Sequence, residues 1–238
     1  MSMKILITGA SKGIGAELAF QLAEGKHKLI LLARSEDALK RVCDKCNEKA
    51  GAKIAFPIVY DLRNLLVDGR DFIKSLDDCS AELDILVNNA AALIKKPFTE
   101  ITLAESKEVF DANYFAVEQL IRLCLPRLKK SSDASIINVT SMAAVQGSSK
   151  FPGLSAYSAS KGALATLTEC LAEEFKEYGI YVNALAFGSV NTEMLAEAFP
   201  GFNAKTSPPE MGSFFKWFVE DGWRRFNGKM LQVSDSTP

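Results

Sequence analysis

The chain contains 238 residues, which is long enough to bury the core of one large α/β domain. Hydrophobic residues make up 48%, charged residues 24%, and the net charge is -1; this composition excludes the charge excess of a nucleic-acid-binding or membrane-surface protein. An apolar run at residues 5–7 ends at Thr8, which is too short for a secretory signal or a membrane span. We therefore expect a cytoplasmic protein that binds neither nucleic acid nor membrane.

Short apolar runs alternate with longer amphipathic segments along the chain. The predicted strands are Lys4–Thr8, Lys28–Ala33, Lys53–Val59, Leu83–Val87, Ala134–Val139, Ile180–Ala186 and Lys229–Val233. Helical patterns fill most of the intervals, and this alternation is typical of βαβ crossovers. The sequence predicts an α/β fold, with a single doubly wound, Rossmann-type domain over residues 1–238. Its sheet is expected to be seven-stranded and mostly parallel, with helices on both faces.

Two stretches are loop-like, Gly147–Ser155 and Pro200–Pro209. We interpret them as insertions at the rim of a site rather than as domain boundaries. The residues after Val233 are polar, and we expect them to fray.

The cysteines and the histidine offer little for catalysis. Five scattered cysteines do not form a disulfide framework. Cys43 and Cys46 form a C-x-x-C, but no second pair or histidine cluster completes a metal site, so we expect two thiols one helical turn apart and no bound metal. The single histidine, His27, is flanked by lysines in a predicted turn and is expected to be solvated. A histidine-based nucleophile triad is excluded.

A glycine-rich turn directly follows the first predicted strand and opens a helical pattern: Thr8-Gly9-Ala10-Ser11-Lys12-Gly13-Ile14-Gly15. Gly9 can form the tight turn, and Gly13 lets the backbone approach a pyrophosphate. Gly15 lets the helix pack closely on the sheet, so that the helix N-terminus points at the phosphates. Such glycines also occur in purely structural turns, but the order strand, turn, helix favours dinucleotide binding.

The end of the second predicted strand indicates which dinucleotide is bound. An acidic residue about 20 positions after the glycines would bind the ribose 2′-hydroxyl of NAD and repel a 2′-phosphate. Ala33 stands at that place, Arg34 offers a planar fork that suits a phosphate, and Lys12 adds a second cation. This predicts NADP(H), unless both cations are only solvated surface charges. Asp61 and Leu62, after the third strand, are placed to contact the adenine.

Tyr157 and Lys161 lie one turn apart in a predicted helix and therefore share a face. Bringing the pKa of a tyrosine from about 10 to neutrality requires about 4 kcal/mol. An ammonium about 4 Å away, at an effective dielectric constant of about 20, supplies roughly that amount. The pair predicts a tyrosine acid/base activated by lysine, although such pairs also occur incidentally on helix surfaces.

Further motifs complete a pattern that resembles the short-chain dehydrogenase/reductase family along nearly the whole chain. Asn88-Asn89-Ala90-Ala91 is similar to the family's N-N-A-G, and Asn113 and Ser141 match its helix asparagine and the serine at the end of its fifth strand. Residues 187–192, Phe-Gly-Ser-Val-Asn-Thr, stand at its P-G-x-V-x-T, and residues 227–233 resemble its last turn and strand.

The resemblance implies a catalytic tetrad of Asn113, Ser141, Tyr157 and Lys161. In the family, the serine and tyrosine hydroxyls hold the carbonyl or alcohol, the lysine binds the nicotinamide ribose and lowers the tyrosine pKa, and the asparagine holds a proton-relay water. The expected cofactor contacts are Gly9, Ser11, Lys12, Gly13, Ile14, Gly15, Arg34, Ser35, Asp61, Leu62, Asn89, Ala90, Tyr157, Lys161, Gly188, Val190 and Thr192.

This sequence departs from the family pattern at three points. Ala91 replaces a glycine and Phe187 a proline, and we expect both changes to tune cofactor affinity. Sixteen positions separate Ser141 from Tyr157, a few more than usual, which predicts a small insertion at Gly147–Gly153 beside the substrate. The longer spacing also leaves the neighbouring Thr140 hydroxyl as an alternative.

The substrate loop is expected at about residues 192–209. Its apolar side chains either face the substrate or pack on the core; they are Met194, Leu195, Ala198, Phe199 and Phe202. The resemblance implies a homodimer or homotetramer formed through the helices at Ala104–Lys129 and Ser155–Tyr178.

The resulting hypothesis is an NADP(H)-dependent oxidoreductase that interconverts a small-molecule carbonyl and alcohol by hydride transfer, with Tyr157 as general acid/base. NADP(H) favours the reductive direction, with a ketone or a 3-oxoacyl thioester as substrate. Two alternatives stay open: a catalytically silent, dinucleotide-binding regulatory protein, and an NAD-dependent alcohol dehydrogenase.

Overall fold

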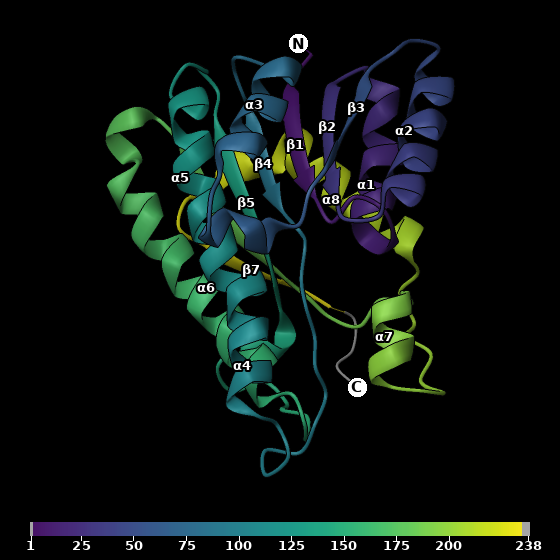
Figure 1. Ribbon diagram of the computed structural model, residues 1–238, viewed down its shortest axis with the longest axis vertical. Coiled ribbons are helices and arrows are strands. Elements are labelled where there is room, and N and C mark those ends of the chain that lie inside the picture. Colours follow the sequence, from purple (N-terminus) through teal and green to yellow (C-terminus); the bar gives the residue numbers. More distant parts are fainter. Residues whose placement is uncertain (1, 235–238) are drawn as a thin grey trace.

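A parallel sheet of seven strands runs through the middle of the molecule (Figure 1). The computed structural model describes residues 2–234. The strands lie in the order β3-β2-β1-β4-β5-β6-β7. Their bounds are β1 Lys4–Thr8, β2 Lys28–Ala33, β3 Ala55–Val59, β4 Ile85–Asn88, β5 Ser135–Ser141, β6 Tyr181–Phe187 and β7 Met230–Val233.

All seven sequence-predicted strands are present, and no boundary differs by more than two residues. Each strand pair is parallel, so the sheet is parallel throughout its described length rather than mostly parallel. Parallel strands are covered on both faces, which is why their sequences are almost continuously apolar.

Helices cover both faces of the sheet. Their bounds are α1 Gly13–Leu22, α2 Glu36–Ala50, α3 Arg70–Cys79, α4 Leu103–Phe110, α5 Ala116–Leu128, α6 Ser155–Glu174, α7 Glu193–Ala198 and α8 Pro208–Glu220. One buried cluster joins α1, α2 and α8 to the sheet, and a second joins α3, α5 and α6. The doubly wound prediction is therefore confirmed. The short α7 lies apart from both layers, where the chain leaves β6 (Figure 1).

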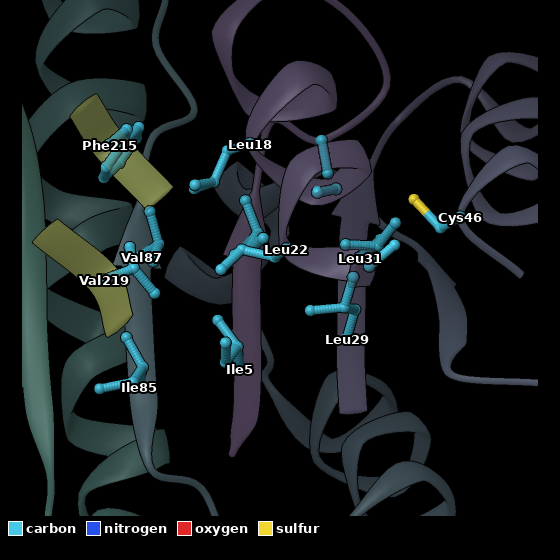
Figure 2. Packing of buried hydrophobic residues seen from close by; sticks show 14 of the residues in the cluster. Ile5, Leu18, Leu22, Leu29, Leu31, Cys46, Ile85, Val87, Phe215 and Val219 are labelled. Atoms are coloured by element: carbon cyan, nitrogen blue, oxygen red, sulfur yellow. The ribbon is translucent and has the colours of Figure 1, made fainter. Parts of the chain in front are cut away.

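Strand β1 illustrates how one strand serves both layers. Ile5 and Ile7 belong to the first cluster, whereas Leu6, between them, belongs to the second. Figure 2 shows Ile5 in the first cluster, with Leu22 of α1 beside it and Val219 of α8 nearby. Burial of a side chain of this size contributes about 1.5–3 kcal/mol to the stability of the fold. Such apolar contacts therefore hold the two helix layers on the sheet.

The strand order places a crevice at the carboxyl edge of the sheet. From β1 the chain builds outward through β2 to β3, and then returns to place β4 on the other side of β1. Loops that leave adjacent strands in opposite directions leave room between them, and ligands of doubly wound folds bind at such a switch point. The loops after β1 and β4 carry the glycine-rich turn and Asn89.

The expectation that His27 is solvated is wrong. Its side chain is buried, Nδ1 accepts a hydrogen bond of 3.1 Å from the N–H of Met3, and Nε2 lies 3.2 Å from Oε1 of Glu220. The flanking lysines suggested an exposed turn, but α8, which is distant in sequence, covers this position. The ring therefore ties the start of β1 to the end of α8.

Cys43 and Cys46 lie on α2 as two buried thiols facing the first cluster. Burial raises the pKa of Cys43 to about 12 and that of Cys46 to about 11, so both are poor nucleophiles. Within residues 2–234, no helix combines the length and hydrophobicity that a membrane span needs. The polar tail that was expected to fray lies, beyond Ser234, outside the described residues.

Candidate active site

The glycine-rich turn joins β1 to α1. Gly9 and Gly13 have φ angles of +66° and +59°, the left-handed region that favours glycine. A Cβ atom on Gly9 would lie 2.8 Å from Cα of Ala90, and one on Gly15 would lie 2.4 Å from Nδ2 of Asn89. The turn therefore leaves no room for side chains at these two positions, and it opens a helix N-terminus of the kind that binds phosphates.

The glycine-rich turn is held against the loop after β4. Thr8 Oγ1 accepts hydrogen bonds of 3.0 Å from the N–H groups of both Asn89 and Ala90. In return, Asn89 Nδ2 donates to the carbonyl oxygens of Thr8 and Gly9, at 3.0 and 3.3 Å. The two loops thus form one unit, in which Asn89 fixes the shape of the turn.

A cavity of about 1150 Å³ extends along the carboxyl ends of the strands from this turn to Tyr157. Gly15 and Asn113 are not among its lining residues. The structure does bring the other sequence-predicted site residues together in its wall: Gly9, Ser11, Lys12, Gly13, Ile14, Arg34, Ser35, Asp61, Leu62, Asn89, Ala90, Ser141, Tyr157, Lys161, Gly188, Val190 and Thr192.

Lys12, in the glycine-rich turn, and Arg34, directly after β2, both line the cavity. The Arg34 side chain is 70% exposed, and its NH1 atom lies 3.9 Å from Oδ2 of Asp61. Asp61 itself is bound by Arg63, whose Nε and NH2 atoms donate to the carboxylate. The hydrogen bonds from Arg63 hold the pKa of Asp61 below its ordinary value.

Ser141, at the end of β5, is hydrogen-bonded to Tyr157 on α6. Burial raises the pKa of Tyr157, and the hydrogen bond with Ser141 acts in the opposite direction. The Ser141 hydroxyl also accepts a hydrogen bond of 3.1 Å from the N–H of Ala143. Of the two hydroxyls that the sequence left open, Ser141 contacts Tyr157, whereas the Thr140 hydroxyl is buried without a hydrogen-bond partner in the described chain.

Lys161 lies one turn after Tyr157 on α6 and is 1% exposed. Its Nζ atom donates a hydrogen bond of 2.8 Å to the carbonyl oxygen of Val139. Burial lowers the pKa of Lys161 to about 8. In this arrangement burial dominates the pKa of the Tyr157 phenol, and the Lys161 ammonium is bonded to the backbone of β5.

Asn113 lies behind the cavity wall. It belongs to a π-helical turn, Asp111–Phe115, between α4 and α5; such turns are frequent at functional sites. Its fully buried amide accepts a hydrogen bond of 2.7 Å from the N–H of Ala92 and donates to Ala92 O and Ser160 Oγ, at 2.9 and 3.0 Å. The side chain therefore supports the loop after β4 and α6 rather than facing the cavity.

The segment before α6, in which the sequence predicts an insertion, folds back on itself. Lys150 Nζ donates hydrogen bonds to the carbonyl oxygens of Ala143 and Val145, at 2.8 and 2.6 Å. Gly153, with a φ angle of +85°, accepts a hydrogen bond of 3.1 Å from the N–H of Lys96. This segment is thus fastened both to the turn after β5 and to the loop after β4, and its Phe151 and Leu154 line the cavity.

Aromatic rings meet at the Tyr157 end of the cavity. The rings of Phe151 and Phe199 lie 5.8 Å apart at 79°, an edge-to-face contact. Lys95 Nζ lies 3.9 Å from the centre of the Phe199 ring and donates to the carbonyl oxygen of Ala198 at 2.8 Å. Phe202 instead contacts Phe199 from outside the main cavity. The other apolar lining residues here are Leu93, Ile94, Leu154, Met194, Leu195 and Ala198.

The two replaced family positions are accommodated without backbone strain. Ala91 lines the cavity, and its φ angle is not positive: in the described chain, Lys26 is the one non-glycine residue with a positive φ. The Phe187 ring is buried, 5.2 Å from that of Phe215 on α8. Neither position therefore requires the residue that the family pattern has there.

Five charged residues of the cavity wall were not predicted from the sequence: Arg63, Lys95, Glu108, Glu193 and Glu197. The last two lie on α7, inside the expected substrate loop. Arg63 stands two positions after Asp61, and this proximity was a usable signal. Lys95 and Glu108 lie in stretches without a motif, and only the folded chain brings them to the cavity.

The model of the family described as short chain dehydrogenase matches residues 3–202. A ketoacyl reductase of Nostoc is 30% identical, with 79% of this chain and 63% of that protein covered; a fatty acyl-CoA reductase of Mycobacterium tuberculosis is 31% identical, with 86% and 69% covered. The chain thus spans about two thirds of the length of these relatives. A short-chain dehydrogenase of Escherichia coli, solved in complex with NADPH, has 28% identity and a TM-score of 0.85 over 97% of this chain and 95% of that one.

Proposed function

The chain belongs to the short-chain dehydrogenase family, and we propose that it is an NADP(H)-dependent oxidoreductase that interconverts a carbonyl and an alcohol with Tyr157 as the general acid/base. The observation that carries this proposal is the continuity of the cavity. One end is the glycine-rich turn, and the other is the cluster of Ser141, Tyr157 and Lys161.

The residues of the cavity fit NADP(H), with its pyrophosphate and its ribose 2′-phosphate. Gly9 and Gly13 line the cavity with positive φ angles, and Gly15 lets the turn pack closely against Asn89; this glycine cradle suits a backbone that lies against a pyrophosphate. Lys12 and Arg34 supply two cations in the cavity wall, where a ribose 2′-phosphate would add negative charge. The NADPH complex of the Escherichia coli relative supports the same choice of cofactor.

Bound in this cavity, NADPH would supply the hydride for carbonyl reduction. The Tyr157 hydroxyl then donates its proton to the carbonyl oxygen that becomes the alcohol, and the Ser141 hydroxyl holds that oxygen. Lys161 places a positive charge one helical turn from Tyr157, which favours loss of the phenolic proton. Asn113 keeps the Ala92 backbone and α6 in register, and so supports the wall on which these groups lie.

We propose an apolar carbonyl compound, a ketone or a 3-oxoacyl thioester, as the substrate. The side chains around Phe151 and Phe199 leave this end of the cavity mostly apolar, so that a hydrocarbon group beside the carbonyl would be buried there. The names of the Nostoc and Mycobacterium relatives, both reductases of acyl compounds, support the reductive direction.

The experiment follows the absorbance of NADPH and of NADH with purified protein, across simple ketones and 3-oxoacyl thioesters. We expect carbonyl-dependent loss of NADPH, slower loss of NADH, and a loss of NADPH affinity of about tenfold or more in Arg34→Ala. No carbonyl-dependent oxidation of NADPH by any compound would contradict the reductase proposal. Unchanged NADPH affinity in Arg34→Ala would contradict the role of Arg34 and favour the NAD-dependent alternative.

We also propose that the protein is cytoplasmic and forms a homodimer or homotetramer through α4, α5 and α6. Light scattering of the purified chain tests the assembly, and a monomeric mass at micromolar concentration would contradict it.

A further inference from the structure

Two carboxylates share one end of the cavity with the cations proposed to bind the 2′-phosphate. Asp61 and Glu108 both line the wall there, as does Arg34. Oδ2 of Asp61 lies 3.9 Å from NH1 of Arg34. An unbalanced carboxylate at this distance would attract the Arg34 guanidinium and repel a phosphate, as the acidic residue of NAD-binding sites does.

Arg63 engages both carboxylates. Its NH2 and Nε atoms donate to Oδ2 and Oδ1 of Asp61 at 2.8 and 3.2 Å, its backbone N–H donates to Oδ1 at 3.0 Å, and its NH1 atom donates to Glu108 at 2.9 Å. Charge-assisted, forked pairs of this kind are stronger than single contacts. The negative charge of Asp61 is therefore balanced from within the protein.

Arg34 differs from Arg63 in what it binds. Among the described residues, its one ion pair is the 3.9 Å contact with Asp61, and its side chain is 70% exposed. Each of the three guanidinium nitrogens of Arg63 already donates to a carboxylate, and its side chain is 37% exposed. Within the described residues, the guanidinium with no hydrogen bond at any of its nitrogens is thus that of Arg34, and Arg63 is the group that leaves it so.

We propose that Arg63 is a positioning residue that determines selectivity for NADP(H) over NAD(H): it holds the Asp61 carboxylate so that Arg34 remains available to a 2′-phosphate. The inference rests on the proposed function, because it takes NADP(H) as the cofactor. Without Arg63, the Asp61 carboxylate pairs with Arg34 instead, and the phosphate meets a neutralised site.

The test measures the dissociation constants of NADPH and NADH by protein fluorescence or calorimetry, with no carbonyl substrate present. We expect Arg63→Gln to lower the NADPH-to-NADH affinity ratio about tenfold, through weaker NADPH binding, while NADH affinity changes less than threefold. In Asp61→Asn/Arg63→Gln, where the competing charge is also removed, the ratio returns to within about threefold of the unmodified protein.

The chain offers a matched control in Arg70. It pairs with Asp68 two positions earlier and, like Arg63, donates its backbone N–H at 3.0 Å and its Nε atom to that carboxylate. Neither residue lines the cavity. Arg70→Gln is therefore expected to leave the affinity ratio unchanged, which separates selectivity from a general effect of losing such a pair. Thermal melting of each variant verifies that it is folded.

Two results would overturn the inference. One is an unchanged ratio in Arg63→Gln in a protein whose ratio does fall in Arg34→Ala. The other is a ratio that stays low in the double variant, because Arg63 would then act on the phosphate itself. A protein that prefers NADH without any substitution contradicts instead the cofactor in the proposed function, so that the two failures are distinguishable.

Discussion

The Lys161 ammonium is buried and donates its hydrogen bond to the carbonyl oxygen of Val139, 2.8 Å away at the end of β5. A charge at this depth is partly stabilised by one carbonyl dipole and loses its hydration. The structure therefore holds the proposed activator of Tyr157 in a position that disfavours its charged form, as its pKa of about 8 reflects. The proposed chemistry therefore requires other contacts of the folded protein to offset the free-energy cost of burying the Lys161 ammonium.

The first prediction concerns this cost. The folded-state pKa of Lys161, about 8, is below its ordinary value of 10.5, so the unfolded chain holds this proton more tightly. The free-energy cost of burying the charged Lys161 ammonium is fully present below pH 8 and disappears as the pH rises toward 10.5. The free energy of unfolding of the unmodified protein, relative to Lys161→Met, should therefore rise by about 3 kcal/mol over that range.

Urea unfolding of both proteins at a series of pH values from 7 to 10.5 provides the measurement. Other titrating groups are common to the two proteins and cancel in the difference. A difference that stays flat, or falls with rising pH, would be incompatible with a lysine whose charge is disfavoured by burial.

The second prediction concerns Tyr157. Tyr157→Phe keeps the ring and removes the hydroxyl, so turnover should fall by a factor of about 10²–10⁴, the usual contribution of a general acid. NADPH affinity should stay within about threefold. Tyr178→Phe is a matched control, because Tyr178 is 39% exposed and lies after the far end of α6.

Steady-state rates and NADPH titrations check this second prediction. A Tyr157→Phe protein with normal turnover would remove Tyr157 from the chemistry. An unmodified protein that binds NADPH but turns over no carbonyl would instead support the silent, dinucleotide-binding alternative.

The third prediction concerns the glycine cradle. In Gly15→Ala, the new Cβ atom would lie 2.4 Å from Asn89 Nδ2 and 2.5 Å from the carbonyl oxygen of Gly9. These atoms must move, so we expect a stability loss of about 1–3 kcal/mol and at least tenfold weaker NADPH binding.

Gly162→Ala is the control for the glycine cradle, because nothing lies within 4 Å of the added atom and the residue is inside helix α6. It should raise stability by about 0.5–1 kcal/mol and leave cofactor affinity unchanged. Denaturation and NADPH titration measure both effects. Equal stability and equal NADPH affinity of the Gly15→Ala and Gly162→Ala proteins would argue against a role of Gly15 in the glycine cradle.

The fold was predictable because its signals are local. Strands buried on both faces are continuously apolar, and glycines such as Gly9 mark a backbone that side chains would obstruct. The sequence also paired Ser141 with Tyr157, and the two side chains are in contact despite the longer loop between them.

What the sequence could not provide are relationships between distant side chains. The His27 prediction was wrong because Glu220, 193 positions away, approaches it. The amide of Asn113 pairs with Ala92 and Ser160, which lie 21 and 47 positions away, while its role in the chemistry stays a prediction. The pairing of Arg63 with Glu108 depends equally on how the loop after β3 and α4 meet. Such pairings follow from packing, which no motif records.

Transfer of deuterium from NADPH to the product tests most directly whether the protein reduces a carbonyl with Tyr157 as the general acid. NADPH labelled with deuterium at the transferring position of its nicotinamide is incubated with the purified protein and an accepted ketone, and the mass of the alcohol is measured. We expect an alcohol that carries one deuterium with the unmodified protein, and a yield reduced at least a hundredfold with Tyr157→Phe. Alcohol formed without deuterium, or formed equally well by Tyr157→Phe, would contradict it.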